Sequence, residues 1–192
     1  MTKTLKNHPS FEVLRIREFR HLLAGRFLFI MGLRMLGTVT GWWIYELTND
    51  PFAIGLIGLA EVIPAVSLAL YAGYVIDISE KRKLLLRGIG FYFLCAIILL
   101  LLSTQLSLTK LGENWIAFCI YGVIFCTGII RAFTGPLFGT MLAAIVPKQQ
   151  LQSATTWNQG IWLSASVSGH ATAGFLIAGM GNTGALSIII GF

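Results

Sequence analysis

Long apolar stretches constrain this sequence more than any other feature. Five of them have about 20 residues or more each, which is enough for an α-helix to cross a hydrocarbon layer of about 30 Å. Lipid offers no hydrogen-bond partner to an open backbone, so each stretch must form a helix. The sequence therefore predicts membrane-spanning helices at about 22–44, 53–76, 84–106, 115–140 and 154–180.

A sixth apolar stretch follows a short turn near the end of the sequence. Residues 181–184 combine two glycines with an asparagine, which is typical of a turn. The stretch from Ala185 to Phe192 would rise only about 12 Å as an α-helix, which is too short to cross a bilayer. We therefore expect residues 1–192 to form one transmembrane unit that is cut within its sixth helix.

The composition agrees with a lipid environment. Charged residues make up 11% of the chain and apolar residues 56%, and the mean hydropathy is +0.78. A soluble domain has about 25% charged residues, because water covers its surface. We predict an all-α membrane protein whose surroundings are the lipid bilayer.

The sequence carries no motif of an enzyme or of a nucleic-acid binder. The net charge is +6, but the basic residues gather in short connectors, so nucleic acid is not a predicted partner. The three cysteines lie inside apolar stretches and lack metal-ligand spacing. No phosphate-binding loop or nucleophile motif occurs. We predict no enzymatic activity, no metal site and no cofactor.

Lysine and arginine are distributed unevenly between the two sets of connectors. One set, together with the N-terminal tail, carries ten of them, and the other carries only Lys110. The excess of basic residues marks the cytoplasmic side of a membrane protein. We predict a multi-pass protein of the cell (inner) membrane with a cytoplasmic N-terminus. The ten residues are Lys3, Lys6, Arg15, Arg17, Arg20, Lys81, Arg82, Lys83, Arg87 and Lys148.

Four charged residues lie inside the apolar stretches, where a charge costs roughly 2.5–3.5 kcal/mol. Arg26 is close to the cytoplasmic edge, and its side chain can extend to that edge. Arg34 lies about 18 Å from the inner edge and Glu61 about 12 Å from the outer edge. In a layer of about 30 Å the two share one depth. We predict that Arg34 and Glu61 pair, either beside a cavity or as a purely structural ion pair.

The fourth charged residue, Arg131, is followed by Gly135 and Pro136, which weaken the helix where a cavity can open. Arg131 either lines such a cavity or makes a structural contact between helices. His170 in the fifth stretch is interpreted as a satisfied core residue. Glycine pairs at helix-packing spacing predict close helix approach: Gly37 with Gly41, Gly135 with Gly139, and Gly55 with Gly58.

The connector between the second and third stretches reads GYVIDISEKRK over residues 73–83. It resembles the signature loop of the major facilitator superfamily, G-x-L-a-D-R-x-G-R-R, and it follows the second predicted helix, as that loop does. The glycine, the aspartate and the terminal basic residues of the motif are kept. The connector departs from the motif at Ile78 and Glu80.

Three further stretches resemble the same superfamily. Residues 41–64 look like the first two spans of its drug- and siderophore-exporter branch. Arg131 followed by Gly135 is similar to its fourth-helix motif. Residues 169–174 lie where exporters show G-P-x-x-G-G, with two departures from that pattern. These departures are His170 and Ala173.

The resemblance implies twelve helices in two six-helix halves, with the substrate held at mid-membrane between them. Residues 1–192 would be the N-terminal half, and the missing C-terminal half would be its partner. The implied function is secondary active transport by alternating access, as proton-coupled export of small amphipathic molecules. The implied substrate and proton pathway contains Arg34, Glu61 and Arg131, and the implied cytoplasmic gate loop contains Gly73, Asp77, Lys81 and Arg82.

Two other interpretations stay open. The changed fifth-helix motif is also compatible with an importer or a facilitator of the same fold. From a different class, the chain could be a non-transporting helical membrane protein, such as a receptor or an assembly subunit. These classes differ in whether the mid-membrane charges face a water-filled cavity.

Overall fold

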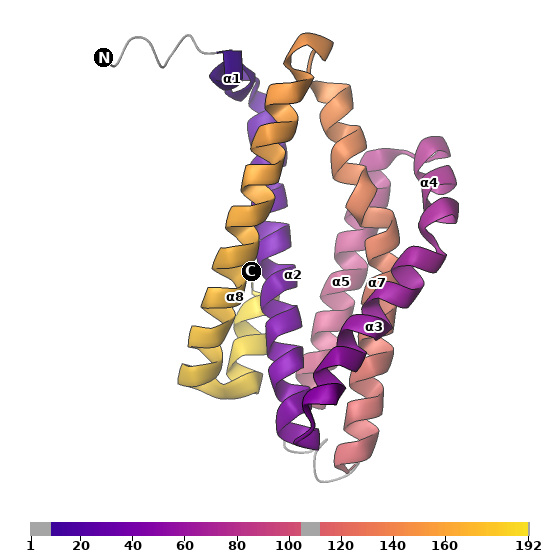
Figure 1. Ribbon diagram of the computed structural model, residues 1–192, viewed down its shortest axis with the longest axis vertical. Coiled ribbons are helices and arrows are strands. Elements are labelled where there is room, and N and C mark those ends of the chain that lie inside the picture. Colours follow the sequence, from indigo (N-terminus) through magenta and orange to yellow (C-terminus); the bar gives the residue numbers. More distant parts are fainter. Residues whose placement is uncertain (1–8, 105–111, 192) are drawn as a thin grey trace.

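The computed structural model describes residues 9–104 and 112–191, which are helical along almost their whole length (Figure 1). No β-strand occurs in these two ranges, so the predicted all-α architecture is confirmed. The helices are α1 (Pro9–Glu12), the short 3-10 helix η2 (Val13–Arg15), α2 (Arg17–Thr48), α3 (Pro51–Ser67), α4 (Ala69–Ile78), α5 (Lys81–Leu102), α7 (Glu113–Ile145), the 3-10 helix η3 (Lys148–Gln150) and α8 (Leu151–Ile190).

Four segments are long and apolar enough to cross a membrane, namely α2, α5, α7 and Lys148–Ile190. α3 and α4 are long and apolar enough only when taken as a pair, and they are bent by 53° at the break between them. The stretch predicted at 53–76 is therefore a broken helix. Pro64 removes a backbone donor in the last turn of α3, and the Ser67 hydroxyl donates to the Ile63 carbonyl at 2.7 Å. Both features weaken the helical hydrogen bonding just before the break.

The long helices form two groups. α2 and α8 run side by side in the same direction, whereas α3 and α5 pack against α7 (Figure 1). α2 also contacts α7 and α3, so it joins the two groups. The fold is thus a bundle in which α2 and α7 are the shared central helices.

Two apolar clusters close the bundle at different heights. The larger one takes buried residues from α2, α3, α5, α7 and α8, among them Ile44, Leu99 and Ile120. The smaller one, with Phe19 and Leu142, lies where α7 leads into α8. Lipid is as apolar as these side chains, so the clusters are held by close packing rather than by transfer out of water. The middle of α2 and α7, between the clusters, is left for polar residues.

The chain reverses direction within α8. Gly181 has φ 66° and ψ −174°, a conformation that side-chain-bearing residues rarely adopt. After it the chain runs back along the bundle (Figure 1). The returning segment is tied to α2 and α5, because Asn182 Nδ2 donates to Glu46 Oε2 at 2.5 Å and Thr183 Oγ1 donates to the Ser103 carbonyl at 3.0 Å. The predicted turn at 181–184 is confirmed.

Close helix approach occurs at glycines other than the predicted ones. A Cβ on Gly41 would meet only an Ile54 methyl group, at 3.9 Å. A Cβ on any of five other predicted glycines would meet nothing within 4 Å: Gly37, Gly55, Gly58, Gly135 and Gly139. The close approaches between helices are at Gly88, Gly128 and Gly169. The predicted glycine pairs were wrong, because spacing along one helix does not show which face meets a neighbour.

The basic connectors of the described chain lie at one end of the bundle. This end holds η2 with Arg15, directly after α1, the α4–α5 connector, and η3 with Lys148 (Figure 1). Lys110, the residue predicted for the opposite side, lies outside the described residues, as do Lys3 and Lys6. The cytoplasmic orientation of this end stays a prediction.

The orientation predicts a labelling pattern. In a background with Cys95, Cys119 and Cys126 replaced by serine, Asn114→Cys should react with an impermeant maleimide in intact cells. Glu80→Cys should react only after the cells are permeabilised. Both side chains are exposed, and they lie at opposite ends of the bundle. The reverse pattern would place the N-terminus outside the cell.

Candidate functional site

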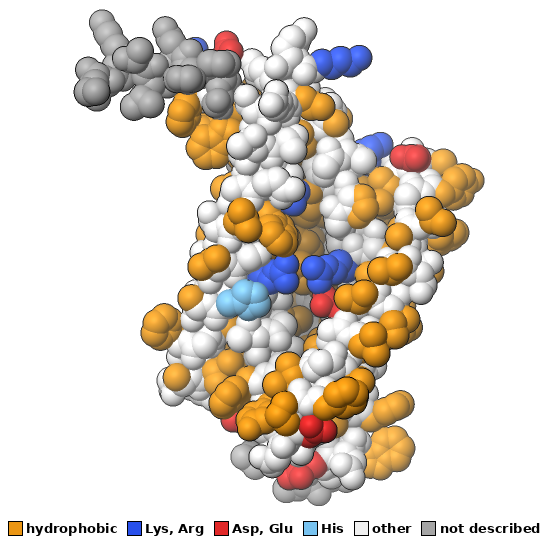
Figure 2. Space-filling model, in the orientation of Figure 1, with side chains coloured by type: hydrophobic (Ala, Val, Ile, Leu, Met, Phe, Trp, Pro, Cys, Tyr) orange, Lys and Arg blue, Asp and Glu red, His pale blue; other side chains and the backbone are white. Residues whose placement is uncertain are grey.

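A charged cavity of about 250 Å³ lies at mid-height, between the two apolar clusters. It is lined by α2, α3, α7 and α8. Figure 2 shows basic, acidic and histidine side chains gathered in a hollow on this face, with apolar side chains around them. The lining residues that carry charge or hydrogen-bonding groups include Arg26, Arg34, Glu61, Arg131, Trp162 and His170.

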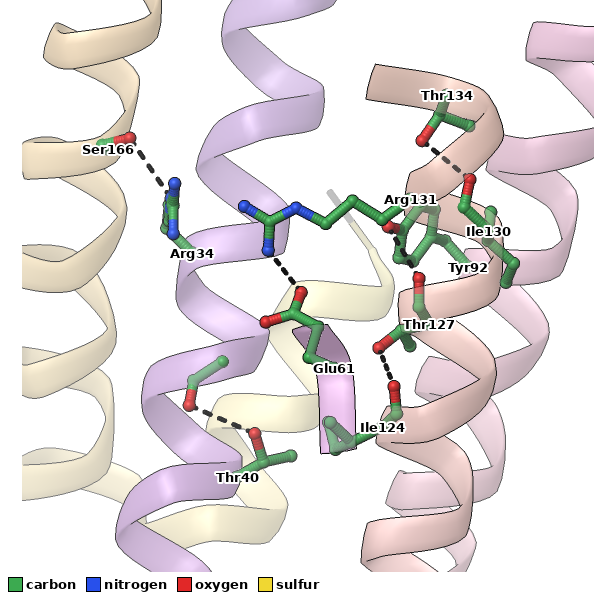
Figure 3. Close-up of polar contacts among 11 residues, drawn as sticks. Arg34, Thr40, Glu61, Tyr92, Ile124, Thr127, Ile130, Arg131, Thr134 and Ser166 are labelled. Carbon is green, nitrogen blue, oxygen red and sulfur yellow. Dashed lines mark hydrogen bonds and ion pairs between the residues drawn. The ribbon is translucent and has the colours of Figure 1, made fainter. Parts of the chain in front are cut away.

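An ion pair joins α3 and α7 within the charged cavity. Arg131 Nη1 donates to Glu61 Oε1 at 2.5 Å, and the two side chains are 40% and 29% exposed (Figure 3). The predicted partner of Glu61 was Arg34. This prediction is wrong, because among the described residues Glu61 forms its ion pair with Arg131. Arg34 and Glu61 share a depth and a cavity, but α7 rather than α2 presents the bonded guanidinium.

Gly128 explains why α7 supplies the partner. A Cβ at this position would collide with the backbone carbonyl of Glu61 and would lie 2.7 Å from Pro64 Cγ. Glycine therefore lets α3 lie directly against α7 at the level of Glu61. Arg131 is three residues further along α7, on the adjacent turn, and reaches the Glu61 carboxylate from there.

Arg34 is held between α2 and α8. Its Nε donates to Ser166 Oγ at 3.2 Å (Figure 3), and its guanidinium carbon lies 5.4 Å from the centroid of the Trp162 ring. That distance suits a cation–π interaction. A glycine again makes the approach possible, because a Cβ on Gly169 would lie 2.7 Å from both Arg34 Cβ and the Met31 carbonyl oxygen.

His170 is bonded to Thr38 one turn below Arg34. Thr38 Oγ1 donates to the Arg34 carbonyl at 2.9 Å and lies 2.7 Å from His170 Nδ1. The hydroxyl has one proton, so with that proton on the Arg34 carbonyl the contact requires His170 Nδ1 to be the donor. His170 is thus satisfied by a partner, as predicted. It lines the charged cavity rather than the apolar core.

Arg26 does not extend away from the bundle. Its guanidinium carbon lies 5.1 Å from the Phe138 ring centroid, and it lines the charged cavity. Its Nε is buried and has no hydrogen-bond partner among the described residues. The Arg26 side chain therefore packs against α7 beside the cavity, and its extension to the membrane edge stays a prediction. The described cavity lining carries three guanidiniums against one carboxylate.

The residues of the predicted gate loop stay outside the charged cavity. Gly73 and Asp77 are on α4, and Lys81 and Arg82 begin α5. The ion pair of this connector among the described residues is Lys83 with Glu80 at 2.7 Å, with both side chains more than half exposed. The resemblance located the loop, but the described contacts assign no partner to Asp77.

Sequence reasoning missed the α8 residues that hold Arg34. Trp162, Ser166 and His170 recur every four residues and so lie on one face of α8, and Arg34 and Thr38 have the same spacing on α2. Two such matched polar stripes in parallel helices are a signal that could have paired them. Among the described residues, no group of three or more histidine, cysteine, aspartate or glutamate side chains could hold a metal ion.

A bundle of several membrane-length apolar helices around a charged mid-height cavity defines a multi-pass membrane protein. The family model described as transmembrane secretion effector matches residues 8–189. The chain therefore belongs to this transporter family of the major facilitator superfamily. No curated protein and no solved structure matches the chain.

The close contact at Gly128 predicts a specific loss of stability. Gly128→Ala should lower the unfolding temperature in detergent, because its Cβ would collide with the backbone of α3. Overpacking of this kind costs about 1–3 kcal/mol. Gly122→Ala on the same helix is the matched control, since its Cβ would meet nothing within 4 Å. Equal effects of the two substitutions would contradict the packing described.

The Glu61–Arg131 pair predicts energetic coupling. Glu61→Gln and Arg131→Gln should each destabilise the protein, because each leaves one charge unpaired. The double variant should lose less unfolding free energy than the two single variants lose together. The difference, measured by thermal or denaturant unfolding, should be about 0.5–3 kcal/mol. The Glu80–Lys83 pair, which is far more exposed, should give a smaller coupling. Additive effects at Glu61 and Arg131 would refute the pair.

Proposed function

We propose that this chain is half of a secondary active transporter that exports small amphipathic molecules by alternating access, with coupling to protons. The position of the charged cavity supports this most. It lies at mid-height, is lined by four helices and contains a carboxylate beside guanidiniums. Secondary transporters hold substrates and coupling ions at such a midplane site. Export, rather than uptake, rests on the resemblance of residues 41–64 to the drug- and siderophore-exporter branch.

Glu61 is the proposed proton site. It is the carboxylate that lines the charged cavity in the described chain, and its partner Arg131 joins α3 to α7. Protonation would neutralise Glu61 and weaken this link between the two helices. A proton would thereby bias the equilibrium between two arrangements of the bundle. Arg34 and Arg131 are the proposed substrate contacts.

A second six-helix half is the proposed cover for the open side of the charged cavity. Large apolar side chains project outward from several helices and need lipid or protein against them. Among them are Val66, Leu70, Val167 and Phe175, which are between 69% and 92% exposed. The missing half would complete the substrate site at the interface of two repeats.

The connector from α4 to α5 is the proposed cytoplasmic gate, with Gly73, Asp77, Lys81 and Arg82 as its residues. Asp77 is exposed. In the described residues it makes no ion pair, so its carboxylate is free to bind a basic group or a helix N-terminus in one conformation only. Such a one-sided contact would favour one of the two transport states.

A second candidate function is uptake by the same fold. The observation that favours it is the departure from the exporter motif at His170, whose ring is bonded to Thr38. A non-transporting receptor is less well supported, because a receptor does not require a carboxylate and three guanidiniums around a mid-height cavity.

Export can be tested in everted membrane vesicles from cells that produce the protein. Energised vesicles should accumulate an amphipathic dye faster than vesicles without the protein, and a protonophore should abolish the difference. Glu61→Gln should reduce accumulation to the level of the empty vesicles. Glu113→Gln, at the exposed end of α7, should leave it unchanged.

Two results would overturn the proposal in different ways. Gradient-driven loss of dye from the vesicles would identify an importer. No movement above that of the empty vesicles, with a panel of anionic, neutral and cationic dyes, would reject transport.

A further inference from the structure

We infer that the substrate is an amphipathic anion, with its acidic group in the charged cavity and its apolar body in the groove beyond His170. This inference rests on the proposed function, because it names the substrate class of the same site. It is carried by three features of the structure: the charge imbalance of the cavity, the unused donors of its arginines, and the continuity between the cavity and an apolar groove.

The charge imbalance favours a negative ligand. Arg26, Arg34 and Arg131 line the charged cavity, and Glu61 is the carboxylate that balances one of them. Two positive charges thus have no ionic partner among the described residues. Charges at this depth in a membrane are costly unless a counter-charge or water is present. An anionic group would supply the counter-charge, whereas a cation would add to the repulsion.

Arg34 and Arg26 also have hydrogen-bond donors that have no acceptor among the described residues. Ser166 accepts from Nε of Arg34. The described residues supply no acceptor for the two terminal nitrogens of Arg34. These two nitrogens form the edge of a guanidinium that binds a carboxylate or phosphate in bidentate fashion. Nε of Arg26 is buried without a partner. Ser166 and Trp162 hold Arg34 in place from α8, so its guanidinium is positioned before a ligand arrives.

An apolar groove continues from the charged cavity. It has a volume of about 590 Å³ and is lined by α2, α3 and α8, with Trp42, Ile54 and Ile177 among its residues. Gly37 and His170 line both the groove and the charged cavity. A ligand with an acidic end and an apolar body would therefore occupy the two spaces without a break between them. The polar groups fix its orientation and the groove accommodates its bulk.

Binding of a matched pair of probes tests the inference without any gradient. The full protein in nanodiscs would be titrated with N-dansyl-phenylalanine and with its carboxamide, which differ in the negative charge. The carboxylate should bind about tenfold more tightly or better, as expected of a charge-assisted bidentate contact. Arg34→Gln should reduce this preference to about twofold or less. Arg34→Lys should restore part of it, because the charge returns without the planar fork.

Two controls separate charge from fold. Arg87→Gln removes an exposed arginine outside the cavity and should leave the preference unchanged. Gly174→Leu should weaken binding of both probes by a similar factor. Gly174 lines the groove, and a side chain there would take up open space in it. Gly122→Leu has the same open surroundings away from the groove and should weaken neither. Thermal unfolding of each variant would show that the nanodisc protein is folded.

The outcomes distinguish this inference from the proposed function. Equal affinity for the two probes, or a preference that survives in both Arg34→Gln and Arg26→Gln, would overturn the anion site. Vesicle transport of the carboxamide but not of the carboxylate would overturn it while leaving transport intact. Selective binding of the carboxylate without gradient-driven movement would reject transport and leave the anion site standing.

Discussion

The Glu61–Arg131 ion pair sets the arrangement of the helices around it. A charge inside an apolar bundle costs several kcal/mol when it has no partner, so the helices that carry charge must meet. Glu61 binds α3 to α7, and the contacts of Arg34 bind α2 to α8. Because these contacts lie at one level, packing above and below them is left to apolar side chains. A polar cavity between two apolar clusters follows from this division.

Glycines beside the charges make these contacts possible. Gly128 lets the backbone of α3 approach α7 at Glu61, and Gly169 lets α8 approach α2 at Arg34. A side chain at either position would separate the helices, and the polar groups would then no longer meet. Packing and electrostatics are therefore not independent here. The same residues that permit close packing also reduce the cost of placing charge in the membrane.

The sequence predicted what depends on depth and missed what depends on the order of helices around the bundle. Apolar length fixes where the chain crosses a bilayer, so the spans and the reversal after residue 180 were predictable. Depth also placed Arg34 and Glu61 at one level, where they share the charged cavity. It could not show that α7 lies nearer to α3 than α2 does at that level, so Arg131 was missed as the partner. The bend after Pro64 was also missed, because the prediction used apolar length, which says nothing about straightness, and not the proline that weakens the helix there.

A negative substrate would give the ion pair a second role. An anion in the charged cavity competes with Glu61 for Arg131, and protonation of Glu61 would free that guanidinium. Protonation of Glu61 would thus decide when Arg131 is open to the anion, which is how the proposed coupling to protons would act. The membrane potential, negative inside, would add an outward force on an anion of about 2.3 kcal/mol per charge for each 100 mV. Export of an anion would then draw on the proton gradient and on the potential, and a protonophore would remove both.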